Sequence, residues 1–570
     1  MVVGTFWAAA VTLLALHIVA VRRDTVNWDE FGLLAKAREA LRTGRVTGGG
    51  RPGLATLVAI PAVGDCTNSV AAVRTARYEW IGFTLLMLGG AWALLRTACR
   101  RAASPALGAA MGLGLLTLVP VFQRWSLQVR ADQPALTASL WAGVLLLDPK
   151  RRISRAFVAG TLFGVGYLCS QKAVYVGLLL ALLAAGDVLA DDAWVARREE
   201  RRALAFAGGA LASIVAYRLV VSALFVLPPV NDFGTLTSAF AGYRSTIGFD
   251  PYVAMLPTLV PHSVLLALLA WATWRQRGSR APQARAAALA WAVLAAGVMV
   301  GLFHAATFPY FWMTLGLFPA FGLALGLDAV LAGIARPAGR VLFIVLVFLA
   351  LFVPTLRAAV LMLDDAQGSQ RLALAFVARN FRPTDRGFQP ESALFCRDEP
   401  KPFPTFFSQD IAWHFYRPGS GSRIEEFIGE FRTRPVAFLV GSFRLDQFPP
   451  EIRRFWAEHY VSYRDNVFVP GREVGGSAGS RIPFEVLVPG PYRWLPAVAA
   501  GASCVSVDGR VFGPGEAVSL RAGDHEVSLG CETRGWLTLA VRDAPGGEDR
   551  RPFYGLAMMW ENSGIRGPRP

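Results

Sequence analysis

Long apolar blocks separated by short polar loops dominate the first 360 or so residues. About eleven blocks have the length and apolar character of bilayer-crossing helices. They lie at residues 3–21, 79–95, 105–122, 133–147, 156–170, 173–189, 203–226, 256–274, 286–303, 309–327 and 341–360. The first block lacks the basic start and small-residue cleavage site of a signal peptide, so we interpret it as a retained helix. The pattern predicts a multispanning α-helical membrane domain over residues 1–361.

Basic residues are concentrated in every second loop between these blocks. This alternation predicts which side of the membrane each loop faces. The basic set comprises Arg96, Arg100, Arg101, Lys150, Arg151, Arg152, Arg155, Arg197, Arg198, Arg201, Arg202, Arg275, Arg277, Arg280, Arg285, Arg336 and Arg340. The short loops of the other set hold only Arg124, Arg130, Lys172 and Arg244. Because cytoplasmic loops carry an excess of Lys and Arg, we expect a multi-pass protein of the cytoplasmic (inner) membrane. Its N-terminus would be cytoplasmic and its C-terminal region periplasmic or extracellular.

Two regions of the chain are predicted to lie outside the membrane. The first outside loop, 22–77, contains an amphipathic pattern over 29–42, which favours a helix lying at the interface. Its apolar run from Leu54 to Val63 contains Pro61 and is too short to span, so we expect it to pack beside the membrane domain. The second region begins near residue 362 and has the composition of a soluble domain.

The C-terminal region divides into an α/β part at 362–470 and a β-rich part at 481–570, joined by a Gly-rich linker at 471–480. A helix pattern near 423–432 and an apolar strand at 436–440 define the first part. Short strands separated by turns in the second predict a β-sandwich. Cys504 and Cys531 flank two of these strands and are candidates for a disulfide, with free thiols as the alternative.

Composition excludes several classes of protein. Hydrophobic residues make up 54% of the chain and charged residues 17%, which excludes a disordered or collagen-like protein. The formal charge of +16 resides mostly in short loops rather than on one face, so it indicates membrane topology and not a nucleic-acid partner. No CxxC or His-rich cluster indicates zinc or a redox centre.

Charged residues at the ends of apolar blocks are the candidates for function, because charge at the membrane border is costly unless it is used. Asp29 and Glu30 follow the first block, where they could be a general base or metal ligands, or merely compensate a helix start. Arg130 and Asp132 lie between the third and fourth blocks, where they could contact substrate or pair with other loop charges.

Lys172 and several later residues form a second group of candidates. Lys172 stands between two apolar blocks with almost no loop, so its ammonium must find an anion or reach the headgroups. Arg244, His262, His304 and Tyr310 lie in later outside loops, where such residues often serve as interfacial anchors instead of ligands.

The order of these features resembles the GT-C superfamily of membrane glycosyltransferases, in the branch of aminoarabinose transferases and protein O-mannosyltransferases. The resemblance covers roughly residues 1–360 and rests on NWDE, RPGL, QVRADQP, SQKAVY and FPYFW. It implies catalytic roles for Asp29, with Glu30 beside it, and Asp132, and in some members a divalent cation (Mg or Mn) held near Asp29 and Asp132. It also implies that Lys172, Arg130 and Arg244 bind the donor phosphate. His304 and Tyr310 are substrate-binding candidates by position only.

The resemblance implies a glycosyltransferase that moves a hexose or pentose from a polyprenyl-phosphate carrier to an envelope glycan, lipid or protein. A transporter or flippase of lipid-linked saccharides is the first alternative. The blocks show no internal repeat and, apart from Arg218, few charges near the midplane, which argues against it. A non-catalytic envelope-assembly component is the second alternative, and it predicts that Asp29 is replaceable.

Overall fold

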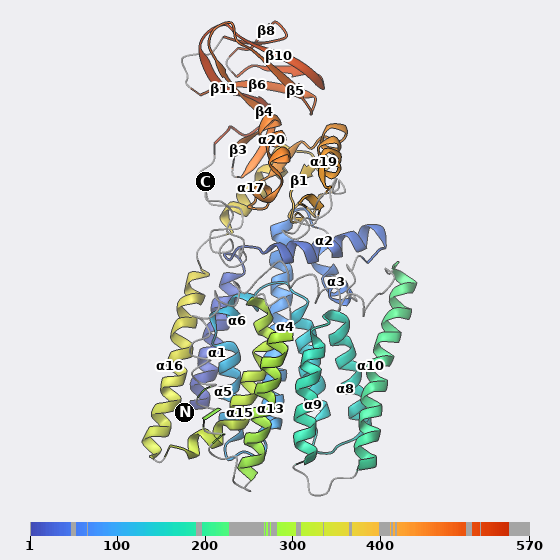
Figure 1. Cartoon of the computed structure of the whole chain (residues 1–570), viewed down its shortest axis with the longest axis vertical. Coiled ribbons are helices and arrows are strands. Elements are labelled where there is room, and N and C mark those ends of the chain that lie inside the picture. Colours follow the sequence, from blue (N-terminus) through green and yellow to red (C-terminus); the bar gives the residue numbers. More distant parts are fainter. Residues whose placement is uncertain are drawn as a thin grey trace.

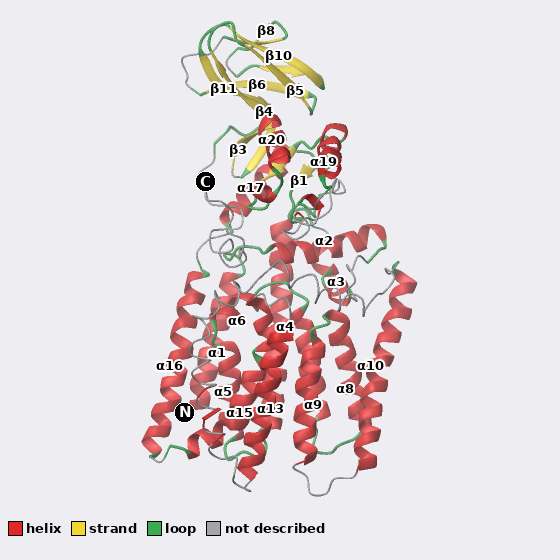
Figure 2. Ribbon diagram, in the orientation of Figure 1, coloured by secondary structure: helices red, strands yellow, loops and turns green. Residues whose placement is uncertain are grey.

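The protein consists of a helical bundle with two further layers stacked on one end (Figure 1). The computed structural model describes residues 2–46, 53–64, 66–189, 196–226, 282–303, 309–334, 336–363, 367–397, 419–464, 466–497, 504–513 and 515–546, with single residues in 267–274 and 411–416. Figure 2 shows that helices form the bundle and that strands gather in the far layer. The N-terminus lies near the bundle end opposite the stacked layers (Figure 1).

All but one of the apolar blocks coincide with helices, and the block at 256–274 lies mostly outside the described residues. The bundle helices are α1 (Val2–Ala20), α4 (Ser69–Ala98), α5 (Pro105–Thr117), α6 (Pro120–Trp125), α7 (Asp132–Leu146), α8 (Ile153–Cys169), α9 (Ala173–Leu189), α10 (Ala196–Leu224), α13 (Pro282–Phe303), η2 (Pro309–Phe311), α14 (Trp312–Leu315), α15 (Leu317–Ala332) and α16 (Pro337–Leu361). Within the described residues, five helices are long and apolar enough to cross a membrane, and four apolar helices are shorter. The protein is thus multispanning, and the count of eleven spans stays a prediction.

The block at 105–122 is not one continuous helix. The structure ends α5 at Thr117 and begins α6 at Pro120. Proline lacks a backbone N–H and suits the first turn of a helix, so it starts α6 instead of extending α5. This break lets the chain turn at the end of the bundle that carries the stacked layers.

The first outside loop lies against that same end, which we call the domain-facing end. It forms α2 (Trp28–Thr43), α3 (Leu54–Val58) and η1 (Ile60–Val63). The apolar side of α2 is buried at Phe31, Leu34 and Ala37, while Glu39 and Leu41 are exposed. The amphipathic helix and the short apolar run thus lie beside the membrane domain, as their patterns predict.

The C-terminal region adds an α/β layer and then a sandwich of two sheets. Its elements are α17 (Gly368–Asn380), β1 (Gly387–Phe388), α19 (Gly421–Thr433), β2 (Phe438–Val440), η3 (Leu445–Gln447), α20 (Pro450–His459), β3 (Tyr460–Arg464), β4 (Val467–Gly476), β5 (Arg481–Val486), β6 (Gly490–Pro496), β7 (Val505–Val507), β8 (Arg510–Val511), β9 (Ala517–Leu520), β10 (Gly523–Leu529) and β11 (Thr533–Leu539). One sheet has the order β1-β2-β4-β11-β6-β9 with β3 also paired to β4, and the other has the order β5-β10-β7-β8. All neighbours pair antiparallel except β1 and β2.

The Gly-rich stretch at 471–480 is not simply a linker, because its first half is strand. β4 pairs with β2 and β3 at Val467–Pro470 and with β11 at 471–476, so one strand belongs to both layers. A Cβ at Gly471 would lie 2.4 Å from the carbonyl oxygen of Leu537. Glycine here permits the close backbone approach to β11 rather than flexibility.

The α/β layer shares one hydrophobic core with the domain-facing end of the bundle. Phe31 and Trp80 from the bundle side join Phe376, Phe395 and Phe438 from the C-terminal side in this core. Gln370 donates a hydrogen bond to the Val26 carbonyl at 2.9 Å and accepts one from the Val26 N–H at 2.8 Å. The segment leading into α2 is therefore held directly by the C-terminal region.

Two disulfides reinforce the extramembrane structure. One joins Cys66 of the first outside loop to Cys396 of the α/β layer, across 330 residues of sequence, and the other joins Cys504 to Cys531 within the sandwich. Sequence reasoning proposed only the second pair, because nothing in the spacing of Cys66 and Cys396 brings them together.

We expect the two disulfides to stabilise different contacts. Replacing Cys66 and Cys396 by alanine removes a cross-link worth about 2–5 kcal/mol, so backbone hydrogen exchange should rise in 23–31 and in α17. The matched variant Cys504→Ala/Cys531→Ala should raise exchange in β7 and β10 and leave 23–31 unchanged. Equal exchange at 23–31 in the wild type and the first variant would contradict a stabilising role for the Cys66–Cys396 bond.

Candidate functional site

At the start of α2, the carboxylates of Asp29 and Glu30, which are adjacent in sequence, point to different sides of the helix. Asn27 is the N-cap and its side chain accepts a hydrogen bond from the Asp29 N–H at 2.9 Å, while the Glu30 carboxylate accepts one from the Asn27 N–H at 2.8 Å. This reciprocal arrangement is a capping box. It turns Glu30 inward and leaves Asp29 on the other side of the helix start.

Glu30 is committed to a buried ion pair with Arg77 of α4. Both side chains are fully buried, and the guanidinium donates to the two carboxylate oxygens at 2.8 and 2.6 Å. Glu30 also accepts a hydrogen bond from the Val129 N–H at 2.9 Å. Because its oxygens are engaged and closed to solvent, Glu30 organises the loops and has no access to a substrate.

Asp29 belongs instead to a charged row of four side chains whose charges alternate in sign: Asp29, Arg130, Asp132 and Lys172. Arg130 donates to Asp29 at 2.7 Å, and its Nε lies 3.6 Å from Asp132. Lys172 donates to both oxygens of Asp132, at 3.0 and 3.1 Å. Ser170 contacts the same carboxylate at 3.3 Å. The structure thus brings together candidates from three separate loops.

Exposure differs along this row. The Asp29 side chain is 33% exposed and that of Lys172 is 20% exposed, whereas those of Arg130 and Asp132 are 8% and 6% exposed. The two ends of the row are therefore accessible, and its centre is nearly closed.

An aromatic side chain lies against both cations. The Tyr310 ring centroid is 3.6 Å from the Arg130 guanidinium and 4.4 Å from the Lys172 ammonium. Trp125 packs edge-on against Tyr310 and lies 5.3 Å from Arg130. Burial alone would lower the pKa of Arg130, but Asp29, Tyr310 and Asp132 together raise it above its ordinary value. Arg130 is therefore a permanent cation held between two carboxylates and an aromatic face.

Local structure explains these positions. Asp132 is the first residue of α7, where an acidic side chain is favoured by the helix dipole. Gln133, next to it and fully buried, donates to the Gln128 carbonyl at 2.6 Å and thereby fixes the loop that carries Arg130. Lys172 lies in the tight turn between α8 and α9. Charges at these sites meet because all three turns lie at the domain-facing end.

The residues around Asp29 and Asp132 do not fit a divalent cation. The Arg130 guanidinium contacts both carboxylates, and the Lys172 ammonium contacts both oxygens of Asp132. Across the described part of the chain, no group of three or more His, Cys, Asp or Glu side chains is placed to hold a metal ion. Cationic side chains therefore stand where a metal would have to bind.

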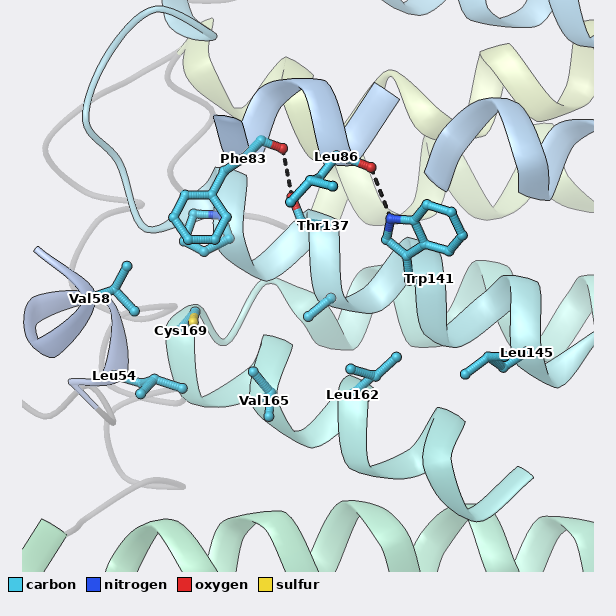
Figure 3. Close-up of a pocket in the computed structure, with 12 residues that line it drawn as sticks. Leu54, Val58, Phe83, Leu86, Thr137, Trp141, Leu145, Leu162, Val165 and Cys169 are labelled. Atoms are coloured by element: carbon cyan, nitrogen blue, oxygen red, sulfur yellow. Dashed lines mark hydrogen bonds between the residues drawn. The ribbon is translucent and has the colours of Figure 1, made fainter. Parts of the chain in front are cut away.

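An apolar groove of about 420 Å³ lies between α3, α4, α7 and α8. It is lined by Leu54, Val58, Phe83, Leu86, Pro134, Thr137, Ala138, Trp141, Leu145, Leu162, Val165 and Cys169 (Figure 3). The polar groups in the wall are already satisfied: Thr137 donates to the Phe83 carbonyl at 2.9 Å and Trp141 to that of Leu86 at 3.0 Å. Its lining includes Pro134, two residues after Asp132, and Cys169, the residue before Ser170. This part of the groove wall is therefore close in the chain to the charged row.

Of the candidates named from sequence, Asp29, Arg130, Asp132, Lys172 and Tyr310 converge. Glu30 does not join them, and Arg244, His262 and His304 lie outside the described residues. Sequence reasoning did not single out Trp125 or Ser170, because one aromatic and one hydroxyl side chain among many carry no signal until the loops are folded together.

The helices and their arrangement define a multispanning membrane protein whose fold is similar to that of a solved GT-C structure. In a search of solved structures, the chain is similar to ArnT from Cupriavidus metallidurans bound to undecaprenyl phosphate, with 15% identity, a TM-score of 0.54, and coverage of 82% of this chain and 97% of that one. An Archaeoglobus fulgidus oligosaccharyltransferase tethered with an acceptor peptide aligns over 95% of this chain and 98% of its own, with 10% identity and a TM-score of 0.48. No protein-family model and no curated protein matches the chain. The predicted resemblance to the GT-C superfamily is confirmed at the level of the fold.

We expect Glu30→Gln to destabilise the protein strongly. The substitution leaves the buried Arg77 guanidinium with Asp24, 3.9 Å away, in place of its close bidentate partner. Breaking a buried ion pair by removing one partner costs about 3–5 kcal/mol. Glu39→Gln, on the exposed side of the same helix, is the matched control and should leave the midpoint of thermal unfolding in detergent near that of the wild type. Equal midpoints for Glu30→Gln and Glu39→Gln would contradict the organising role of Glu30.

Proposed function

We propose that the protein is an integral-membrane glycosyltransferase that transfers a sugar from a polyprenyl-phosphate donor to an envelope acceptor. The acceptor is a hydroxyl-bearing glycan, lipid or protein on the outer side of the cytoplasmic membrane, with the N-terminus inside and the C-terminal domains outside. The GT-C fold supports this assignment, because the similar ArnT structure is bound to undecaprenyl phosphate.

The observation that carries the proposal is that the apolar groove and the charged row share the same two stretches of chain. A polyprenyl-phosphate sugar has a long apolar chain, an anionic phosphodiester and a polar sugar in that order. The groove has apolar walls that include Pro134 and Cys169, which lie four and three residues from the cations Arg130 and Lys172. The order of surfaces in the protein therefore matches the order of groups in the donor.

Arg130 and Lys172 are the proposed phosphate-binding residues. The Nε of Arg130 is buried 3.6 Å from Asp132 and makes no hydrogen bond in the described structure, so in this proposal the guanidinium turns toward the donor and gives this N–H to a phosphate oxygen. Lys172 is held by Asp132, and a donor phosphate would compete for the same ammonium. In this proposal Asp132 is a positioning residue that keeps Lys172 at the site, and Tyr310 supports both cations through its ring.

Asp29 is the proposed general base. It is the most exposed carboxylate of the row, and its contact with Arg130 places it beside the phosphate-binding cation. In the transfer step, Asp29 takes the proton of the acceptor hydroxyl as that oxygen attacks the anomeric carbon. The bond from the anomeric carbon to the phosphate oxygen breaks, its electron pair stays on the polyprenyl phosphate, and the sugar is transferred with inversion. Arg130 and Lys172 stabilise the negative charge that develops on the phosphate.

Asp29→Asn should lower kcat for sugar transfer by about 10²–10⁴-fold, because an amide cannot take the acceptor proton. Lys172→Met should lower transfer by about 10²–10³-fold through loss of charge stabilisation on the departing phosphate. The measurement uses purified protein in lipid, radiolabelled polyprenyl-phosphate sugars and a crude envelope-glycan acceptor.

Arg379→Met is the control, because Arg379 pairs with Asp543 in the C-terminal region and is largely exposed. It should transfer sugar at the wild-type rate. Wild-type turnover that survives Asp29→Asn would refute the base assignment. If the wild type neither transfers nor releases sugar from any donor of the panel, the glycosyltransferase proposal fails and a transport role takes precedence.

Filling the groove should discriminate between donors by chain length. Ala138→Trp places an indole in the groove and should raise KM for a donor with a long polyprenyl chain by about tenfold or more, the cost of losing roughly two buried methylene groups. KM for a donor with a two- or three-isoprene chain should change less. Leu342→Trp, on the exposed surface of α16, is the control. Equal increases in KM for long and short donors would mean that the polyprenyl chain of the donor does not bind in this groove.

A further inference from the structure

A buried ion pair in the α/β layer reaches the start of α2. Arg444, in the loop after β2, has its Nε 3.1 Å from a Glu391 oxygen, and the two side chains are only 3% and 0% exposed. Ser442 donates to the same Glu391 oxygen at 2.8 Å, and Gln389 donates to the other. Arg444 Nε does not donate a hydrogen bond in this contact, but separating two charges so completely removed from water would leave both uncompensated, so the guanidinium is held beside Glu391.

The fixed guanidinium packs on Trp28. Its central carbon lies 4.8 Å from the Trp28 ring centroid, within the range of a cation–π contact. Phe443 lies beside both, 5.7 Å from the Trp28 ring and 5.4 Å from Arg444. Trp28 is itself buried, so its indole is enclosed by groups from the C-terminal region.

Trp28 is the first residue of α2, and Asp29 is the second. The direction in which Asp29 leaves the helix start depends on how that first turn is held. On the inward side the turn is held by Glu30 and Arg77. The contact of Arg444 with Trp28 supplies a second restraint, which comes from a part of the chain more than 400 residues away.

We propose that Arg444 is a positioning residue for the transfer reaction, which acts through Trp28 to hold Asp29 against Arg130. The proposal rests on the proposed function, because it assigns Asp29 the role of base. Arg444 does not touch the substrate in this account. It makes the α/β layer part of the catalytic unit, since the layer contributes one restraint on the base.

The test is a double-mutant cycle on kcat. Arg444→Met should lower kcat by about 10–100-fold with KM for the donor unchanged, because displacement of a reacting group by about 1 Å costs up to about 10²-fold. In an Asp29→Asn background the same substitution should change the residual rate by less than about twofold, because the base it positions is gone. Arg444→Lys keeps the charge beside Glu391 and should retain more activity than Arg444→Met.

A merely structural role gives a different result. If Arg444→Met only reduces the amount of folded enzyme, it lowers the rate by the same factor in both backgrounds, and the inference is overturned while the transfer function stands. Hydrogen exchange of the peptide covering 27–31 supplies a readout independent of activity. It should increase in Arg444→Met and not in the control Arg379→Met. If the wild type shows no transfer, the proposed function fails, and unchanged exchange at 27–31 would separately refute the contact.

Discussion

The ion pair between Glu30 and Arg77 is the contact on which the rest of the site depends. It joins α2 to α4 in a fully buried setting, and through the Val129 N–H it also holds the loop that leads to Arg130. Two charges removed from water have few alternative arrangements, because any loosening leaves one of them unpaired. The pair therefore fixes the start of α2 relative to α4 and to the loop before α7. The direction of the Asp29 side chain follows from the position of that helix start.

In the row from Asp29 to Lys172, two carboxylates balance the formal charges of two cations. In the proposed transfer, a phosphodiester that takes over part of the contacts of Arg130 and Lys172 adds one negative charge. The leaving phosphate gains a second negative charge while the acceptor proton neutralises the carboxylate of Asp29. The aromatic ring of Tyr310 supports both cations without competing for the phosphate.

Sequence alone located most of the bundle and several site residues, because bilayer thickness dictates the length of apolar blocks and charge is costly at their ends. Asp132 and Lys172 became candidates in this way, and the structure brings them into contact. Adjacent Asp29 and Glu30 could not be assigned different roles from the residues alone, since the distinction depends on Arg77, which lies at the far end of the same loop, 47 residues after Glu30. The contact of Arg444 with Trp28 could not be predicted from the sequence for another reason. The two residues are more than 400 positions apart in the sequence, and no local pattern predicts a contact over such a separation.

The strand β4 has a mechanical consequence. Because its first residues pair with β2 and its last with β11, the sandwich and the α/β layer share a continuous ladder of backbone hydrogen bonds. A force applied to the sandwich along β4 therefore reaches the α/β layer through strand pairing and without a loop between them. Because the α/β layer also shares a core with the domain-facing end of the bundle, the sandwich is held at a fixed distance from the helices.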